Sequence, residues 1–65
     1  MKHTLSPRQV EIMRRLCRGL AAKEIAGELG IGVCTIEGHI KIAKRRLGAR
    51  NIVQAAVLFS QSSHP

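Results

Sequence analysis

Apolar residues recur at helical spacing along the chain, most regularly between Ile31 and Gly48. One stripe of this stretch is apolar and consists of Ile36, Ile40, Ala43 and Leu47. The opposite face carries Glu37, Gly38, Lys41, Lys44 and Arg45. The pattern therefore predicts a helix over residues 33–47 with one face suited to a protein core and the other to a polyanion.

The residues before and within this stretch have the spacing of a helix-turn-helix, in the triplet Ala26, Gly30 and Ile36. A small residue lets two helices approach, a glycine supplies a left-handed turn conformation, and a branched apolar residue fixes the second helix on the first. An ordinary amphipathic helix hairpin would share the apolar pattern but not the triplet. The triplet favours a DNA-binding unit, and the second helix, roughly 22 Å long, can lie across a major groove.

Capping signals predict the other helices. Ser6 and Gln9 form a capping box, and Asn51 and Gln54 form another. With the helix above, they predict an all-α, four-helix domain with helices over about 7–18, 22–29, 33–47 and 52–61. Residues 1–5 are expected to be a short tail, and residues 60–65 a frayed helix end.

The helix predicted over residues 22–29 has a weak start. Glu24 is placed to complete a capping box, but Ala21 offers no side-chain oxygen. Glycines take the next two boundaries: Gly30 closes this helix and Gly32 is the N-cap of the following one. Gly38 lies inside that helix, where it would let DNA approach the backbone; simple tolerance of glycine is the alternative.

Two further apolar stripes complete the predicted core. The first helix contributes Val10, Met13, Leu16, Cys17 and Leu20, and the last contributes Ile52, Ala55, Ala56 and Phe59. The last helix is apolar nearly all round, which leaves Val53, Val57 and Leu58 outside its core stripe. An exposed apolar strip is usually an interface. It predicts a homodimer contact, although the three residues could also be merely scattered on the surface.

Composition limits the classes of protein. A chain of 65 residues with one Phe, no Trp and no Tyr makes one small domain with an aliphatic core. No apolar run approaches the roughly 20 residues that span a bilayer. Met1 to Pro7 is short and polar rather than a signal peptide. No membrane association is expected, and the expected compartment is the cytoplasm.

The charge is strongly basic, with a net +7 and a pI near 10.9. Five cations cluster within ten residues: Lys41, Lys44, Arg45, Arg46 and Arg50. Such a footprint is typical of a nucleic-acid binder. A membrane-active cationic peptide would share the charge, but it would not explain the capping boxes or the turn glycine.

Catalytic and metal chemistry find little support. Cys17 and Cys34 lack a CxxC partner, and His39 is poorly spaced from Cys34 for zinc. Cys17 is expected to be a small core residue, and Cys34 to lie near DNA. The four carboxylates do not pair convincingly with a histidine, and no nucleotide-phosphate loop is present. We expect no enzyme activity, no metal and no cofactor.

The chain from Leu5 to about Phe59 resembles the LuxR/NarL-type helix-turn-helix domain. The resemblance lies in the residues Leu5 to Gln9, Gly19, Lys23 to Ala26, Leu29, Ile31, Thr35, Ile36, His39, Leu47 and Ala55 to Val57. It implies a four-helix domain that binds double-stranded DNA as a transcription regulator. In that family the third helix enters the major groove and the fourth often pairs two subunits on an inverted repeat.

The resemblance also implies site residues. Base contacts would fall on Glu37, Gly38 and Lys41, and the position of Cys34 at the helix start adds a fourth. Contacts to the DNA backbone would come from Lys23 and Thr35, and the basic residues later in the same helix as Thr35 add Lys44, Arg45 and Arg46. His39 is expected to brace the helix rather than touch bases.

Four departures from the family pattern bear on stability and site preference. Glu37 stands where a basic residue is frequent, Ala21 and Gly32 replace the usual Ser or Thr caps, and Ala22 replaces a usual Asn. Relatives also usually carry a sensing domain before this one. The alternative function is a protein-interaction module that pairs through the helix at 52–61 with a related regulator or with RNA polymerase.

Overall fold

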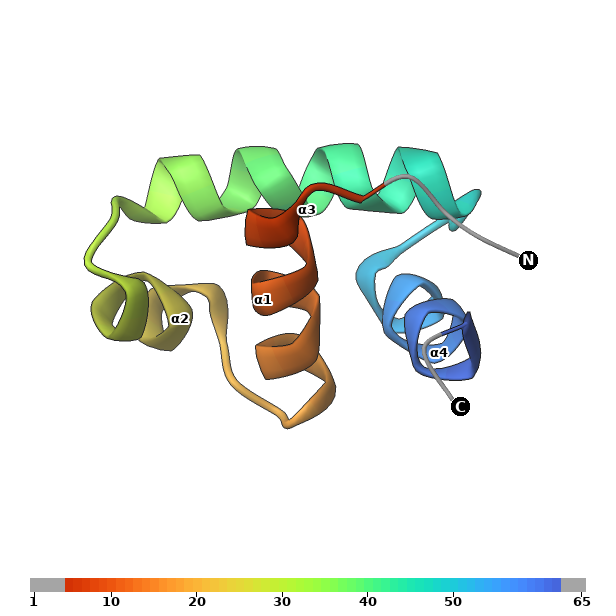
Figure 1. Ribbon diagram of the computed structural model, residues 1–65, viewed down its shortest axis with the longest axis horizontal. Helices are drawn as coiled ribbons and strands as arrows, with labels where there is room; N and C mark the ends of the chain where they lie inside the picture. The colour runs from red at the N-terminus through yellow and green to blue at the C-terminus, as the bar shows by residue number, and fades with distance from the viewer. Residues whose placement is uncertain (1–4, 63–65) are drawn as a thin grey trace.

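Four α-helices joined by short turns make up the described part of the chain (Figure 1). The computed structural model describes residues 5–62, with α1 at Pro7–Cys17, α2 at Ala22–Leu29, α3 at Val33–Leu47 and α4 at Ile52–Ser62. Residues 5–62 contain no strand, which confirms the predicted all-α class. The predicted helix ends agree to within one residue. The tail predictions for residues 1–4 and 63–65 lie outside the described residues, and α4 includes residues 60–62, three of the positions expected to fray.

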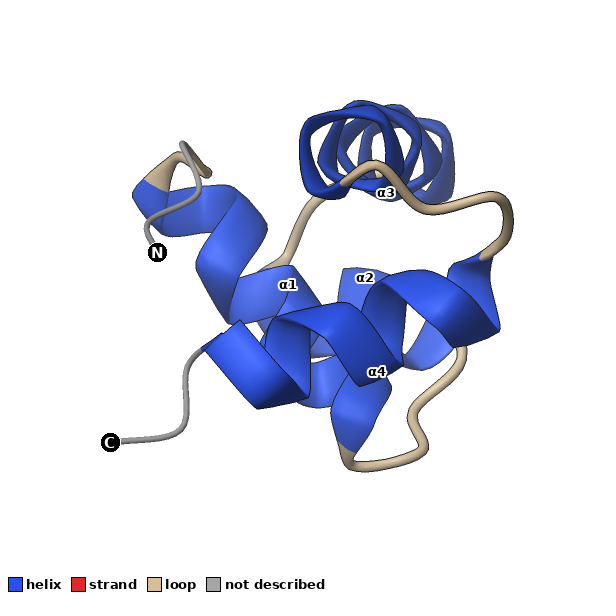
Figure 2. Cartoon of the chain, turned by 90° about the vertical axis from the view of Figure 1, so that its right-hand side faces the viewer, coloured by secondary structure: helices blue, strands red, loops and turns tan. Residues whose placement is uncertain are grey.

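Helix α3 lies across the other three helices (Figure 1). It packs against α1, α2 and α4, and α1 also contacts α2 and α4. Seen end-on in Figure 2, α3 has the other helices on one side only. Its opposite side is therefore not covered by any described helix.

The helix starts follow the predicted capping chemistry with one difference. Ser6 Oγ accepts from the Gln9 N–H at 3.2 Å, and Gln9 Oε1 accepts from the Ser6 N–H at 3.0 Å, a complete capping box. Asn51 Oδ1 likewise accepts from the Gln54 N–H at 2.8 Å. Gln54 Oε1, however, accepts from the Arg50 N–H at 2.6 Å, so the predicted reciprocal bond lies one residue earlier.

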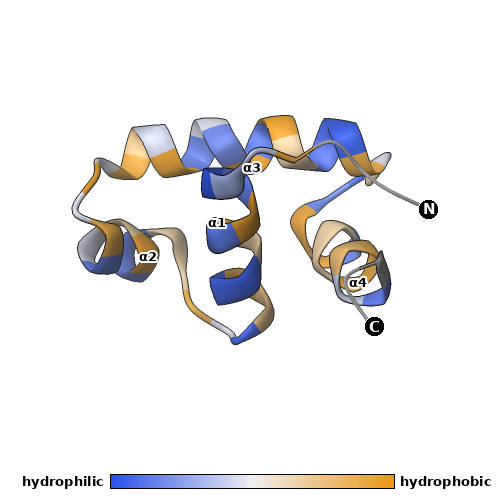
Figure 3. Ribbon diagram, in the orientation of Figure 1, coloured by the Kyte–Doolittle hydropathy of each residue, from blue (hydrophilic) through white to orange (hydrophobic). Residues whose placement is uncertain are grey.

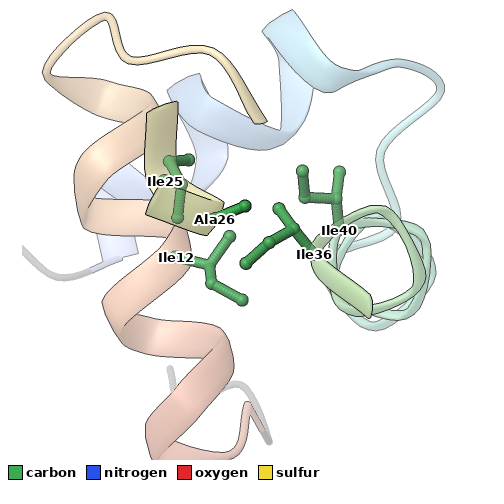
Figure 4. Close-up of a cluster of buried hydrophobic side chains, with 5 residues drawn as sticks. All are labelled: Ile12, Ile25, Ala26, Ile36 and Ile40. Atoms are coloured by element: carbon green, nitrogen blue, oxygen red, sulfur yellow. The ribbon is translucent and has the colours of Figure 1, made fainter. Parts of the chain in front are cut away.

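The buried side chains form two clusters, and α1 contributes to both. The first cluster joins α1, α2 and α3 and is made of Ile12, Ile25, Ala26, Ile36 and Ile40, whose side chains point toward one another (Figure 4). The second joins α1, α3 and α4 and is made of Met13, Ala43, Ala55 and Phe59. Because α1 enters both clusters, it holds the helix-turn-helix and α4 in one body.

Three core predictions are corrected. Ile12 is fully buried although the predicted stripe omitted it, because adjacent residues of α1 face different neighbours and a single stripe follows only one of them. Cys17 is exposed, since it ends α1 beside α4. Ile52 is 41% exposed because the first turn of α4 begins outside the second cluster.

Candidate nucleic-acid interface

The turn between α2 and α3 has the geometry that the triplet predicted. Ala26 is buried where the two helices meet, and Ile36 is fully buried beside it. Gly30 has φ +69°, a left-handed conformation that favours glycine. The N–H groups of Gly30 and Ile31 both donate to the Ala26 carbonyl, at 2.9 and 3.1 Å. The turn thus fixes how α3 leaves α2.

The outward face of α3 carries the four residues predicted to contact bases. All four are exposed: Cys34, Glu37, Gly38 and Lys41. Ile36, Ile40 and Ala43 are buried on the opposite side. Along the ribbon of α3, hydrophobic and hydrophilic residues alternate (Figure 3). The structure therefore brings the predicted base-contact set together on the side of α3 that no described helix covers.

Gly38 has no packing reason to be glycine. A Cβ built at this position meets no heavy atom within 4 Å. Its backbone is an ordinary helical one, since the described positive-φ glycines are Gly19, Gly30 and Gly48. The fold itself would accept a side chain here, so the reason for glycine lies outside the folded domain or in simple tolerance.

The predicted backbone-contact residues surround this face. Lys23, Thr35, Arg45 and Arg46 are exposed, whereas Lys44 is partly buried. Lys23 follows Ala22, and Ala22 lines a groove with residues of α3 and the first residue of α4. The groove is lined by Ala22, Glu37, Gly38, Ile40, Lys41, Lys44 and Ile52. The start of α2 and the start of α4 therefore both border the recognition helix.

The acidic residues do little to neutralise the positive charge of α3, because most of them lie on other helices. Glu11 pairs with Arg8 at 3.2 Å and Glu28 pairs with Arg15 at 2.8 Å. Glu24 Oε1 accepts from the Ala21 N–H at 2.7 Å. These three acids are thus engaged on α1 and α2, and Glu37 is the one acid within α3. A field of this kind attracts a polyanion.

Helix α4 exposes part of the predicted dimer strip. Val53 is 70% exposed and Val57 49%, and their spacing of four residues puts them on one face of the helix. Leu58 is partly buried and lies about 100° around the helix from Val57. The exposed strip is therefore narrower than the three predicted residues.

His39 and Cys17 were both predicted to have structural roles, His39 in bracing α3 and Cys17 in the core. His39 is partly buried, and its bracing role stays a prediction. Cys17 Sγ lies 3.5 Å from the Ala56 carbonyl oxygen, and burial raises the pKa of the Cys17 thiol. Within residues 5–62, no three His, Cys, Asp or Glu side chains are grouped as metal ligands.

Sequence reasoning missed one residue of this face. Ile42 is 38% exposed, and it belongs to neither buried cluster nor to the side chains packed on them. The signal was available, because Ile42 lies four residues after Gly38 and so shares its side of the helix.

The fold and this face define a helix-turn-helix DNA-binding domain. Residues 3–59 match the family described as bacterial regulatory proteins, luxR family. The chain therefore belongs to the luxR family, and the predicted class, DNA-binding transcription regulation, is confirmed.

Named relatives agree with this assignment. The chain is 37% identical over 57 residues to the nitrate/nitrite response regulator protein NarP of Escherichia coli (strain K12), an alignment that covers 88% of this chain and 26% of the relative. It is 36% identical over 52 residues to the transcriptional regulatory protein UhpA of the same organism, covering 80% of this chain and 26% of the relative. The chain thus spans about a quarter of these relatives. No helix in the described part is both long and apolar enough to cross a membrane.

Proposed function

We propose that this chain binds double-stranded DNA in a sequence-specific manner, with α3 in the major groove. One observation carries the proposal: α3 packs against three helices on one side and leaves the opposite side, with its cations, uncovered. A helix of about 15 residues fits a groove about 12 Å wide. The chain then acts as the DNA-binding part of a transcription regulator in the cytoplasm.

The base contacts come from the exposed residues of α3. Lys41 suits the O6 and N7 acceptors of guanine, and Glu37 can accept from the N4 amino group of cytosine. Gly38, without a side chain, lets the bases approach the helix backbone. Cys34 completes the set near the start of α3. These four residues supply the sequence preference.

The backbone contacts come from the residues around them. Four cations and one hydroxyl position the domain on the phosphates without specifying sequence: Lys23, Thr35, Lys44, Arg45 and Arg46. Their contribution depends on salt, because phosphate contacts release counterions.

A homodimer on DNA would use α4. Val53 and Val57 form its exposed apolar strip, and Leu58 lies at its edge. Two subunits related by a two-fold axis would read an inverted repeat whose half-sites lie about one helical turn apart. The same strip supports the second candidate, a module that pairs with a related regulator or RNA polymerase. That alternative leaves the basic face of α3 without a role.

Selection from a random duplex library with the purified chain tests the proposal. An enriched inverted repeat is the expected result and would support both base recognition and dimeric binding. A single enriched half-site would keep the DNA function and contradict pairing through α4. A library with no enriched motif at moderate salt would contradict sequence-specific binding and favour the interaction module.

A further inference from the structure

Ile42 is an apolar residue on a surface otherwise suited to a polyanion. It is 38% exposed, whereas Ile36 and Ile40 of the same helix are 0% and 7% exposed. It joins neither buried cluster, and it is not among the side chains packed on them. Ile42 therefore lies outside the two buried clusters and keeps part of its apolar surface exposed on this side of α3.

Ile42 continues an uncharged line along the outward side of α3. Cys34, Gly38 and Ile42 follow one another at four-residue spacing, which places them on one side of the helix. Lys41 and Arg45 lie beside this line. The line is about 12 Å long, since a helix rises about 1.5 Å per residue. It can therefore pass several base-pair steps of about 3.4 Å each.

The major groove offers one apolar group to such a side chain. Phosphates and the polar edges of the bases give an isoleucine nothing to bind, whereas thymine presents its C5-methyl group there. We propose that Ile42 contacts a thymine methyl group and specifies thymine at one position of the half-site. This inference rests on the proposed function, because it requires α3 to lie in the major groove.

The test removes the two partner groups separately. The duplex enriched in the library selection is remade with 2′-deoxyuridine at one thymine of the half-site at a time, which deletes only the methyl group. Dissociation constants are measured by fluorescence anisotropy for the wild-type chain and for Ile42→Ala. Lys44→Ala is the control, because loss of a phosphate contact should weaken binding to the thymidine duplex and to the deoxyuridine duplex alike. A thermal melt of Ile42→Ala checks that the variant is folded at the temperature of the binding assay.

The expected result is one thymine at which loss of the methyl group weakens wild-type binding about fourfold, as for the burial of one methylene. At that position the uridine-to-thymidine ratio of dissociation constants should fall to about one in Ile42→Ala and stay about fourfold in Lys44→Ala. A ratio that is the same for wild type and Ile42→Ala at every thymine overturns the inference and leaves the proposed function intact. A selected half-site without thymine overturns it in the same way. Failure to enrich any motif overturns the proposed function and this inference with it.

Discussion

Arg15 Nε donates to Glu28 Oε1 at 2.8 Å and so joins α1 to α2. The Arg15 side chain is 25% exposed and the Glu28 side chain 49%, so water screens the pair only in part. Arg15 also donates from Nη1 to the Glu11 carbonyl at 3.2 Å, which limits the freedom of its guanidinium. The pair ties α2, the first helix of the helix-turn-helix, to α1.

Arg15→Met should lower the free energy of unfolding by about 0.2–1 kcal/mol, the range measured for exposed pairs. Urea unfolding at low and high salt measures it, and the loss should shrink at high salt. Arg8→Met is the control, because its pair with Glu11 lies within one helix and should be worth less. If Arg15→Met and Glu28→Gln destabilise additively in the double variant, the two side chains are not coupled.

Ala21→Ser should stabilise the domain by about 0.5–2 kcal/mol. Ala21 has the extended backbone of an N-cap, with φ −81° and ψ 160°, but it contributes no side-chain bond. Glu24 already accepts from the Ala21 N–H, so a serine hydroxyl at position 21 would complete a capping box at the start of α2. Ser6 and Gln9 form a box of the same kind at the start of α1.

A thermal melt measures this gain, which corresponds to about 4–8 °C per kcal/mol in a domain of this size. Ser6→Ala is the matched change in the opposite direction and should lower Tm by a similar amount. A serine variant that melts with the wild-type chain would show that the start of α2 does not limit stability.

Much of the fold could be predicted because its signals are local. The capping box at Ser6 and the turn glycine at Gly30 depend on a few neighbouring residues, and both have the predicted geometry. The buried stripe of α3 was predicted from its period, because one side of that helix meets all the others. The same period put the predicted base-contact residues on its uncovered side.

The remaining features depend on where helices meet, which spacing alone does not determine. Helix α1 lies between two clusters, so Ile12 and Met13 are both buried although no single stripe contains both. Cys17 and Ile52 fit their stripes but stand at helix ends, outside the packed region. Ile42 was missed because the polar face was described by its charges, although its spacing from Gly38 already placed it on that face.

Gly38→Ala should stabilise the free domain and weaken DNA binding. Replacing an interior helix glycine with alanine gains about 1 kcal/mol, and no atom within 4 Å opposes the new methyl group. On DNA the same methyl group would stand between the helix backbone and the bases.

Melting and DNA binding of this variant are compared with those of Gly27→Ala. Gly27 is also an exposed helix glycine with nothing within 4 Å, but it lies in α2. Both variants should gain stability, and only Gly38→Ala should lose affinity for the selected duplex. Equal affinity of the two variants would mean that glycine is merely tolerated at position 38.

Lys44→Ala should change the overall affinity for DNA, whereas Glu37→Ala should change the sequence preference. Loss of a phosphate contact at Lys44 should weaken all sequences alike and reduce the salt slope by about one. Loss of Glu37 should change the relative affinities for site variants, because a carboxylate reads cytosine and cannot bind phosphate.

Binding titrations at several salt concentrations separate these effects. They compare the wild-type chain with both variants, on the selected duplex and on single-base variants of that duplex. Arg18→Ala is the control of equal charge, since Arg18 caps the end of α1 that lies away from α3 (Figure 1). If Glu37→Ala keeps the order of affinities among site variants, its role in reading sequence is wrong.

The two cysteines should respond differently to DNA. Both are exposed and free, but Cys34 lies near the start of α3 whereas Cys17 ends α1 beside Ala56. Saturating duplex should slow alkylation of Cys34 by iodoacetamide, because α3 is then covered. Although the residue is exposed, partial burial of the Cys17 thiol raises its pKa, so less thiolate is present and its alkylation should be slower in the folded chain than in urea at the same pH.

Mass spectrometry of each cysteine peptide with and without duplex gives both rates in one sample, and the Cys34→Ser variant isolates Cys17. Cys17 lines a hollow with Ala56, Val57, Ser60 and Gln61, next to the strip proposed for pairing. Slower alkylation of Cys17 on an inverted repeat but not on a half-site would therefore report pairing through α4. If saturating duplex leaves the alkylation rate of Cys34 unchanged, the start of α3 does not lie against DNA and the proposed placement of the recognition helix is wrong.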